Sequence, residues 1–599
     1  MRPRHATTIP VLVLTASLAF AETTGLVPLT DLGSDPYHGF PGGLYPGGDD
    51  APPQPHLDAA LACATEIVPR DAAGNPAPAG FIAMIAVGMS NTTHEFAVFE
   101  RDQDRNRARN ARVVILDSGL GGQDASTIAD PAASYWQVLD RRLAALELTP
   151  AQVQVAWLKE AEAGPPNDFP GHAIALREDL ERIANNLHDR YPNLKLCYVS
   201  SRTYGGYATG SLNPEPQAYE SGFSVKWLIE DQILGDPGLN HGQLASPVRA
   251  PLLLWGPYLW ADGTKPRSDG LVWHRADFET DGTHPSPAGE QKVGNLLGAF
   301  FAADATAAAW WPARGDSLVT TIEVTDDAHV SAGDAAGNFG AAVQLVQVGS
   351  ATPSNVYLAF DAATVARPVV MSKLSLRVVQ GGGGRASLVP DAGFSETGIT
   401  WSNAPAIGSA IVDMPQSSRD GTIGASVTDE FSADTDGRFA VALSALTGGQ
   451  QTYWSGEGGQ PPRLVLVVAC PFDGDGDGLG DACDCAPADP SAFAVPDEID
   501  GLRWVGSELL SWDAEAVLSG SGTRYEVMRG DLGGVSDLGP GPEDVCVAAD
   551  IAETETTDPS PLPAADSGFF YLVRARNTCG ASRWETATSG EDRATAPCQ

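Results

Sequence analysis

Residues 81–94 read FIAMIAVGMSNTTH, and this stretch predicts how the first half of the chain folds. Residues 81–87 are apolar throughout, as in a short strand that is buried on both faces of a sheet. The run ends in Gly88-Met89-Ser90-Asn91, where a polar segment begins. In parallel α/β sheets the functional groups gather at the carboxyl ends of the strands. Ser90 is therefore a candidate nucleophile, and the alternative is an ordinary strand-to-helix turn.

Four further apolar runs continue this pattern through residues 22–310. Amphipathic stretches lie between them, such as residues 135–146 and 173–190. Strands that alternate with helices predict a parallel sheet with both faces covered, which makes a three-layer α/β domain. The four runs are RVVILDSG at 112–119, VQVAWLKEA at 153–161, LKLCYVSSR at 194–202 and PLLLWGPYLW at 251–260.

The first 21 residues have the three parts of a secretory signal peptide. Arg2 and Arg4 precede a short apolar core, and Ala19-Phe20-Ala21 forms an A-x-A cleavage signal. We expect cleavage after Ala21 and a secreted, extracellular protein. No later apolar run approaches the roughly 18 residues that a membrane span needs.

Composition narrows the classes of partner. The chain has 599 residues, enough for several domains, and a formal net charge of −39. Such an acidic surface repels phosphate backbones, so we expect no nucleic-acid partner. Eight cysteines suit an oxidising compartment, but their spacing does not define their pairing. The oligomeric state is left open by the sequence.

A serine hydroxyl needs a base to take its proton, usually a histidine oriented by a carboxylate. The best pair is Asp281 and His284 in DGTHP, on a predicted loop before an amphipathic helix that begins near Ala288. An aspartate three residues before a histidine can bring both side chains to one pocket. The alternative for Asp281 is an Asx-turn that caps this helix. His94, four residues after Ser90, is a rival base that would share its helix face.

Together, G-x-S-N after the first strand and D-x-x-H-P near the domain end resemble the first and last blocks of the SGNH/GDSL hydrolases. The G-x-S-N form is similar to the branch with sialate O-acetylesterases. The resemblance implies a flavodoxin-like fold, ester hydrolysis, Ser90 as nucleophile, His284 as base and Asp281 as its orienter. The family's glycine-bearing second block matches DSGLGGQDAS at 117–126. The oxyanion donors would be the N–H groups of Ser90 and Gly122, with Gly121 as the alternative to Gly122.

The third block departs from the family pattern. Its strand ends in Trp157-Leu158-Lys159-Glu160-Ala161-Glu162, so a lysine, Lys159, stands where the family has a neutral amide donor. Lys159 can donate to an oxyanion, although its side chain differs from an amide in shape and pKa. Alternatively, Asn91 can supply the amide. Arg202, at the end of the next strand, is a further candidate for contact with the substrate.

Aromatic residues cluster in the later part of this domain. Indole faces stack on the apolar faces of sugars, which would suit a carbohydrate substrate, whereas the alternative is core packing. The residues are Tyr204, Tyr207, Trp255, Tyr258, Trp260 and Trp273. Tyr204, Trp260 and Trp273 are the substrate-binding candidates.

Residues 311–318 are predicted to be a linker, and the helical period disappears over 319–468. Short alternating runs such as NVYLAFDAA and RFAVALS predict a β-sandwich. With DDAHVSAGDAAGNFG, ITWSNAPAIG and YWSGEGGQPPRLVL, the segment resembles the DNRLRE-type carbohydrate-binding sandwiches of secreted proteins. That resemblance implies binding of an extracellular polysaccharide; the alternative is a spacer without a ligand.

Residues 469–495 contain DGDGDGLGDACD, an acidic loop that begins at Asp473. Counted from there, carboxylates occupy positions 1, 3, 5, 9 and 12, with glycine at position 6, which is the spacing of an EF-hand-like calcium loop. With its flanking cysteines the loop resembles thrombospondin type 3 repeats, and we expect a structural Ca²⁺. Its ligands would be Asp473, Asp475, Asp477, the Leu479 carbonyl, Asp481 and Asp484.

Residues 496–599 return to short strands and loosely resemble a fibronectin type III domain. The whole chain is thus expected to be an α/β hydrolase domain followed by all-β modules. The expected function is a secreted serine esterase that deacylates a carbohydrate or polysaccharide, with no catalytic cofactor. The alternative is a non-catalytic polysaccharide-binding or adhesion protein with a relict hydrolase fold.

Overall fold

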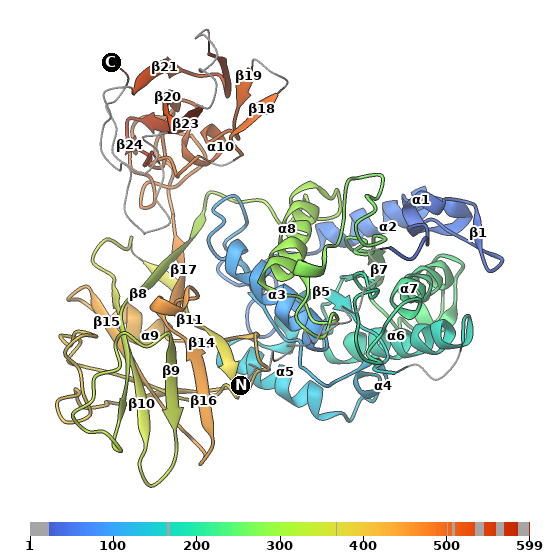
Figure 1. Cartoon of the computed structure of the whole chain (residues 1–599), viewed down its shortest axis with the longest axis horizontal. Coiled ribbons are helices and arrows are strands. Elements are labelled where there is room, and N and C mark those ends of the chain that lie inside the picture. Colours follow the sequence, from blue (N-terminus) through green and yellow to red (C-terminus); the bar gives the residue numbers. More distant parts are fainter. Residues whose placement is uncertain are drawn as a thin grey trace, which may run out of the picture.

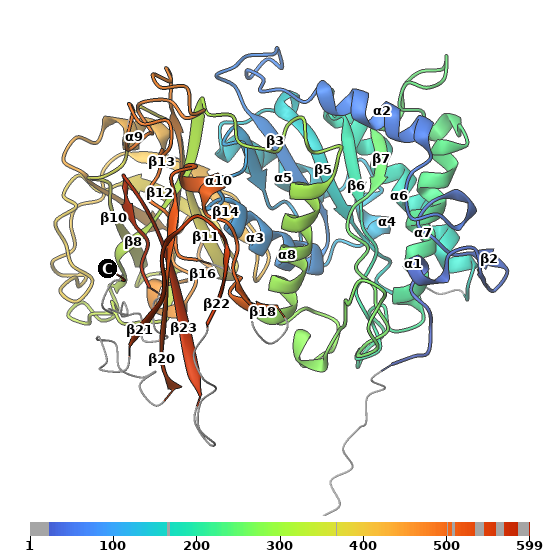
Figure 2. The same ribbon diagram turned by 90° about the horizontal axis from the view of Figure 1, so that it is seen from above.

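The computed structural model describes residues 23–164, 168–366, 368–499, 501–505, 509–532, 544–558, 568–584 and 598. The segment predicted to be a signal peptide lies outside these residues. Three parts follow one another along the chain (Figure 1): an α/β domain, a β-rich middle domain and a β-rich C-terminal domain. The α/β and middle domains lie side by side in both Figure 1 and Figure 2.

The α/β domain is built on a five-stranded parallel sheet in the order β4-β3-β5-β6-β7. This is the flavodoxin-like order 2-1-3-4-5, and each strand coincides with one of the predicted apolar runs. Every residue of these strands is buried, because helices cover both faces of the sheet. The strands are β3 (Ile82–Gly88), β4 (Val113–Leu116), β5 (Val153–Lys159), β6 (Leu196–Val199) and β7 (Leu252–Trp255).

The direction of the crossovers determines where the helices lie. The chain moves from β3 to β4 in one direction and from β4 through β7 in the other. Right-handed crossovers therefore put α3 on the opposite face from α5, α6 and α7. The pairs α3 with α8 and α6 with α7 pack together. The helices are α1 (Leu29–Leu32), α2 (Gln54–Thr65), α3 (Ser90–Gln103), α4 (Ala125–Ile128), α5 (Ser134–Ala145), α6 (Gly171–Arg190), α7 (Gln217–Ile233) and α8 (Pro287–Ala303).

The direction reverses between β3 and β5, and this is where ligands bind in open α/β sheets. Ser90 follows β3 there, and Lys159 is the last residue of β5. A short hairpin, β1 (Pro36–Tyr37) and β2 (Phe40–Pro41), precedes the sheet in the chain.

The middle domain is antiparallel throughout. Nine of its ten described strands form one hydrogen-bonded run, and β14 pairs with β11 beside that run. The run curls, because β9 pairs with β10 as well as β16 and so closes it into a barrel-like sandwich. The elements are β8 (Ser317–Ser331), β9 (Gln344–Val348), β10 (Ser354–Asp361), β11 (Val369–Gln380), β12 (Gly384–Leu388), β13 (Ala410–Met414), β14 (Thr422–Ser426), α9 (Thr428–Ala433), β15 (Arg438–Ser444), β16 (Gln450–Trp454) and β17 (Arg463–Ala469).

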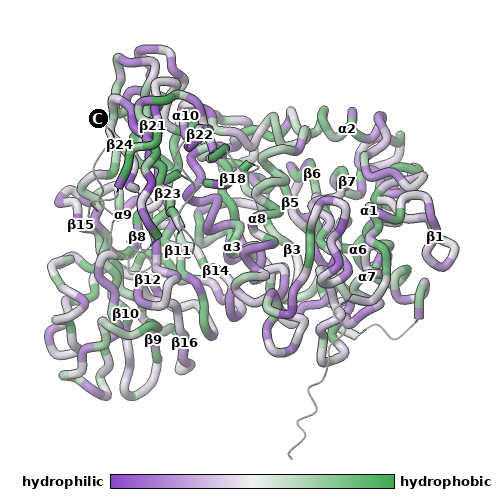
Figure 3. Tube along the Cα trace, turned by 45° about the horizontal axis from the view of Figure 1, so that its top comes forward, coloured by the Kyte–Doolittle hydropathy of each residue, from purple (hydrophilic) through white to green (hydrophobic). Residues whose placement is uncertain are grey.

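The predicted linker at 311–318 is part of the folded structure. Trp311 is buried against Phe99 and Phe301, and β8 already begins at Ser317. Val319 and Met371 of the middle domain belong to the same hydrophobic core as the α/β sheet. The hydropathy trace shows apolar segments along the strands of both domains (Figure 3). The core of the α/β domain therefore extends into the interface with the middle domain, whose other buried side chains form clusters of their own.

The C-terminal domain has a three-stranded sheet, β18-β19-β22, and a four-stranded sheet, β21-β20-β23-β24. Disulfides join Cys470 to Cys483, Cys485 to Cys579 and Cys546 to Cys598, which settles the pairing that the sequence left open. The elements are β18 (Arg503–Val505), β19 (Leu509–Ser511), α10 (Ala516–Ser519), β20 (Arg524–Asp531), β21 (Val545–Ile551), β22 (Glu555–Thr557), β23 (Phe569–Asn577) and β24 (Gly580–Ala581). Among the described residues, no helix has both the length and the apolarity for crossing a bilayer.

Candidate active site

Ser90 is the first residue of helix α3 and directly follows the turn after β3. The first N–H groups of a helix have no partner within it and carry partial positive charge. The turn requires Gly88, because a methyl group there would lie 2.3 Å from both the Lys159 carbonyl oxygen and Thr92 Oγ1. The hydroxyl of Thr92 donates to that carbonyl at 2.6 Å and ties α3 to the end of β5.

Ser90, His284 and Asp281 form one hydrogen-bonded line. Ser90 Oγ lies 2.9 Å from His284 Nε2, and His284 Nδ1 lies 2.5 Å from Asp281 Oδ2. An ionised carboxylate can only accept, so Nδ1 carries the proton and Nε2 is left to accept from the serine hydroxyl. This is the arrangement that activates a serine.

The turn that carries His284 is held by the carboxylate of Asp281. Its Oδ1 accepts the N–H groups of Thr283 and His284, at 2.9 and 3.0 Å. Partial burial would raise the pKa of Asp281, but the hydrogen bonds from His284 and Thr283 outweigh it and hold that pKa below its usual value. Gly282 has φ +69°, and a side chain there would meet the Tyr207 carbonyl.

Asn91 connects the nucleophile helix to the histidine turn. The side chain is buried, and its Nδ2 donates to the Thr283 carbonyl at 2.8 Å. From the sequence, Asn91 is a candidate amide donor to an oxyanion. In the structure this amide is engaged in holding the two loops together, which keeps Ser90 and His284 within reach.

Lys159 is not free to act as the oxyanion donor that its place in the third block suggested. Its Nζ forms a buried ion pair with both carboxylate oxygens of Glu95, at 2.5 and 2.6 Å. Burial lowers the pKa of Lys159 to about 8, although Glu95 opposes this shift. A lysine that already neutralises a buried carboxylate is a structural counter-ion, so we correct its assignment as an oxyanion donor.

Arg202 is not exposed for contact with a substrate. It is buried, and Glu95, Glu160 and Glu215 all interact with its charge. Burial raises the pKa of Glu160 well above its usual value and that of Glu215 to about 7. Arg202 is thus the cation of a buried acidic cluster, and its expected contact with substrate is corrected.

The aromatic cluster packs into the core instead of offering stacking surfaces. Tyr204, Trp260 and Trp273 are at most 1% exposed. Their polar groups are used internally: Trp260 Nε1 donates to Glu215, and Trp273 Nε1 donates to the Leu259 carbonyl. The prediction that these residues bind sugar is wrong for this conformation, since an indole must expose a face to stack.

The second block provides a glycine loop beside Ser90. A methyl group on Gly121 would lie 3.6 Å from Ser90 Cβ, which places the loop against the nucleophile. The Gly121 N–H donates to Ser418 Oγ of the middle domain at 2.6 Å. Gly122 is exposed, with φ +76° and open space around its Cα. Because Gly121 N–H is engaged, Gly122 is the better candidate for an oxyanion donor.

His94 is not placed as a base for Ser90. Its ring centre lies 5.6 Å from that of His284, and its Nδ1 faces Glu290 at 3.7 Å. Burial, together with the charges of Arg377 and His284, lowers the pKa of His94 to about 3. A neutral, buried histidine beside the ring of His284 is a packing residue.

The acidic loop fits a hard cation. The carboxylates of Asp473, Asp475 and Asp477 converge within 4.8 Å of one another. Oδ2 atoms of Asp475, Asp477 and Asp484 are buried without a hydrogen-bond partner among the described residues. Burial and the neighbouring carboxylates raise the pKa of Asp477 and Asp484. Converging carboxylate oxygens, three of them buried without a hydrogen-bond partner, suit Ca²⁺, which prefers oxygen ligands.

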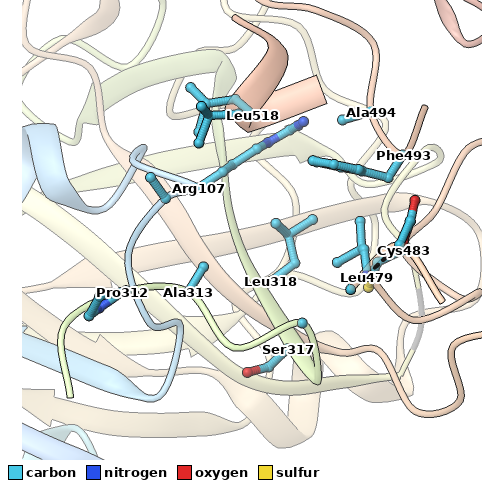
Figure 4. A pocket seen from close by; sticks show the side chains of 15 residues that line it. Arg107, Pro312, Ala313, Ser317, Leu318, Leu479, Cys483, Phe493, Ala494 and Leu518 are labelled. Carbon is cyan, nitrogen blue, oxygen red and sulfur yellow. Dashed lines mark hydrogen bonds between the residues drawn. The ribbon is translucent and has the colours of Figure 1, made fainter. Parts of the chain in front are cut away.

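The loop lies at the junction of all three domains. It borders a cavity of about 320 Å³ that Arg107 and Pro312 line from the α/β side, Leu318 from β8 and Phe493 and Leu518 from the C-terminal side (Figure 4). The Gly480 N–H donates to the Gly315 carbonyl.

Sequence reasoning missed Glu95 and the middle-domain loop at 416–421. Glu95 follows His94 on α3, but only the folded structure shows that it faces Lys159. The loop lies some 300 residues beyond Gly121, and no local pattern signals its contact with the site.

Comparisons with known proteins complete the description. The comparison with curated proteins finds no match. Two solved structures overlap with the chain at 11% identity each. An extracellular lipase from Streptomyces rimosus covers 37% of this chain and 99% of its own, with a TM-score of 0.20. A carbohydrate acetylesterase from Xanthomonas citri covers 64% and 78%, with a TM-score of 0.21. Residues 319–468, which make up most of the middle domain, match the model of carbohydrate-binding module family 96.

Proposed function

We propose that the protein is a secreted serine esterase of SGNH type that removes acyl groups, acetyl above all, from a carbohydrate or polysaccharide. The observation that carries the proposal is the line from Ser90 through His284 to Asp281, with separations of 2.9 and 2.5 Å. No metal or organic cofactor is needed for this chemistry, because the histidine supplies the proton transfer.

In the first half-reaction Ser90 Oγ attacks the ester carbonyl carbon while His284 Nε2 takes the hydroxyl proton. Asp281 stabilises the imidazolium that forms. The tetrahedral intermediate then collapses, and His284 returns the proton to the sugar oxygen that leaves. The products of this half are an acyl-serine and a free sugar hydroxyl.

The negative charge of the intermediate forms beside the N-terminus of α3. In the proposal the N–H groups of Ser90 and Gly122 donate to it, and the fourteen-residue helix adds its dipole. Lys159 and Asn91 support the site without contacting the substrate, since Lys159 neutralises Glu95 and Asn91 donates to the Thr283 carbonyl.

In the second half-reaction His284 takes a proton from water, which attacks the acyl-serine. Collapse of the second intermediate releases the carboxylic acid and restores Ser90. Transfer of the acyl group to another sugar would use the same residues with a sugar hydroxyl in place of water.

The carbohydrate part of the proposal rests on the family 96 module that is fused to the esterase domain. Its association with a serine hydrolase site favours an ester-bearing polysaccharide over a lipid.

The acidic loop is proposed to bind a structural Ca²⁺ through Asp473, Asp475, Asp477, Asp481, Asp484 and the Leu479 carbonyl. The unpartnered carboxylate oxygens there support this. Bound Ca²⁺ would neutralise the loop and stiffen the joint between the middle and C-terminal domains.

The test compares the full-length protein with Ser90→Ala on a small aryl acetate and on an acetylated polysaccharide. We expect Ser90→Ala to abolish hydrolysis of both, while Ser268→Ala, at an exposed serine, leaves activity unchanged. A fluorophosphonate should label Ser90 in the wild-type protein. Wild-type protein that is neither active nor labelled, yet binds polysaccharide, would instead identify a binding protein with a relict hydrolase fold.

A further inference from the structure

The carbohydrate-binding module sends one loop, residues 416–421 between β13 and β14, onto the esterase domain. At its beginning the buried guanidinium of Arg142 donates to the Gln416 carbonyl through Nε and Nη2, at 3.2 and 3.0 Å. Arg142 also donates to the carbonyls of Asp117 and Gly119, just before the glycine loop. The start of the module's loop and the approach to the glycine loop therefore share one anchor.

The middle of the loop contacts the glycine loop beside the nucleophile. Ser418 Oγ accepts the Gly121 N–H at 2.6 Å, and Ser90 Cβ lies on the same side of Gly121. A methyl group on Gly121 would lie 3.1 Å from Ser418 Oγ and 3.6 Å from Ser90 Cβ. Ser418 and Ser90 thus border the same space, although they come from different domains.

The next residue of the loop reaches the turn that carries the catalytic base. Arg419 forms an ion pair with Glu279 at 2.8 Å. The Glu279 N–H in turn donates to the His284 carbonyl at 2.8 Å. The module therefore touches the histidine turn one hydrogen bond away from His284.

The end of the loop packs against the helix that carries Ser90, because a methyl group on Gly421 would lie 2.7 Å from Thr93 Oγ1 of α3. The Thr422 N–H donates to Asp117 Oδ2 at 3.1 Å, and the hydroxyl of Thr93 on α3 donates to the same oxygen. Burial raises the pKa of Asp117 to about 6, while Arg142 and Thr93 lower it. All three elements that hold the proposed catalytic groups are thus contacted by a single loop of the module.

Buried charges keep the module in this position. Lys373 of β11 forms ion pairs with Glu100 and Asp104 at 2.9 and 2.7 Å, and Arg377 pairs with Glu290 at 2.7 Å. All five side chains are at most 5% exposed. Breaking a buried pair is strongly unfavourable, because an uncompensated charge remains. The contact between the domains is consequently a fixed part of the fold.

We propose that Ser418 of the carbohydrate-binding module is a positioning residue of the esterase site, which holds the oxyanion loop through the Gly121 N–H. The inference rests on the proposed function. By engaging the Gly121 N–H, Ser418 fixes the Leu120–Gly121 peptide plane, directly before the peptide that carries the Gly122 N–H, and leaves the Gly122 N–H for the oxyanion. The esterase and the module are then one catalytic unit, in contrast to a catalytic domain with a tethered targeting module.

The test uses full-length Ser418→Ala with a small aryl acetate that does not need the module's sugar site. A displacement of about 1 Å in a catalytic group reduces turnover by up to about 100-fold, so we expect kcat to fall about 10- to 100-fold. KM should change less than threefold, because the donor acts on the transition state. Phosphonylation of Ser90 by a fluorophosphonate should slow in parallel, since the phosphoryl oxygen accepts hydrogen bonds from the same oxyanion donors.

Two variants serve as controls. Ser418→Thr keeps the hydroxyl and should retain most of the wild-type kcat. Ser350→Ala removes a serine hydroxyl that bonds only within the module, to the Thr352 carbonyl, and should leave kcat unchanged. Polysaccharide binding should be equal in all of these proteins.

The outcomes separate the inference from the proposed function. A Ser418→Ala protein with wild-type kcat, or with a changed KM alone, would overturn the inference and leave the esterase intact. A higher kcat would also overturn it, because Ser418 would then be blocking a Gly121 donor. A wild-type protein without Ser90-dependent hydrolysis would remove the proposed function, and the inference with it.

Discussion

The buried pair of Lys159 and Glu95 gives the sharpest test of how the site is built. Their side chains are 1% and 0% exposed. Lys159→Met would leave the carboxylate of Glu95 buried without its nearest cation, which costs about 3–5 kcal/mol. We expect the lower end, about 3 kcal/mol, because Arg202 still faces Glu95.

Glu95→Met should be less destabilising, and its effect should depend on pH. The lysine that remains can lose its proton, since burial already lowers its pKa to about 8 from 10.5. A base with a lowered pKa in the folded state makes stability rise with pH up to its unfolded value. The loss in this variant should therefore be smaller at pH 9 than at pH 7.

The double variant Lys159→Met/Glu95→Met decides between a structural and a catalytic lysine. Apolar replacement of a buried pair is often neutral for stability, so most of the loss should be recovered. If Lys159 only neutralises Glu95, kcat should stay within about tenfold of the wild type. Loss of an oxyanion donor would instead reduce kcat by about 10²–10³-fold in a protein that is folded.

Scanning calorimetry and aryl acetate hydrolysis measure the two effects. About 3 kcal/mol should lower the Tm of the α/β unit by roughly 6–12 °C in Lys159→Met. A double variant with a restored Tm and a kcat reduced more than 100-fold would refute the reasoning and return Lys159 to the oxyanion hole. A Lys159→Met protein as stable as the wild type would refute the burial argument itself.

Three further predictions concern other parts of the molecule. His94 has a folded pKa of about 3 against 6.5 unfolded, so the unfolded state takes up its proton first and stability falls as the pH drops below 6.5. Between pH 7 and pH 5, protonation of His94 in the unfolded state should lower the free energy of unfolding by about 2 kcal/mol. His94→Asn should therefore show a smaller Tm difference between the two pH values than the wild type. An equal difference would contradict the assignment. Removing Ca²⁺ with a chelator should lower the Tm of the C-terminal part, and Asp475→Asn/Asp477→Asn should be insensitive to the chelator; a wild-type protein with the same Tm in both conditions would argue against a structural ion. Gly88→Ala places a methyl group 2.3 Å from the Lys159 carbonyl oxygen and should reduce kcat about 100-fold. Gly298→Ala meets only the end of the Gln103 side chain and should have little effect. Equal kcat values in the two variants would show that the turn at Gly88 does not position Ser90.

Local patterns predicted the elements of the α/β domain well. Each of the five apolar runs contains a strand, and the amphipathic stretch at 173–190 lies within α6. Buried parallel strands and amphipathic helices each have a hydrophobic pattern within a few consecutive residues, so a single sequence is enough to find them.

Patterns that depend on partners were predicted less well. Tryptophans such as Trp260 and Trp273 suit a sugar platform and a core equally, and only the packing around them shows that they are buried. Residues 311–318 have the composition of a linker, yet Trp311 packs into the core of the α/β domain. Burial is a property of neighbours that are distant in sequence, and composition does not report it.

For this protein, the sequence alone predicted the order of its domains, the strand that precedes Ser90 and the candidates Asp281 and His284, because each depends on short-range spacing. The tertiary structure decided that Ser90 and His284 meet at 2.9 Å, that Lys159 belongs to Glu95 and that Ser418 of the module reaches Gly121. These contacts join residues from about 60 to 300 positions apart. Only the packing of the sheet, the helices and the module against one another brings them together.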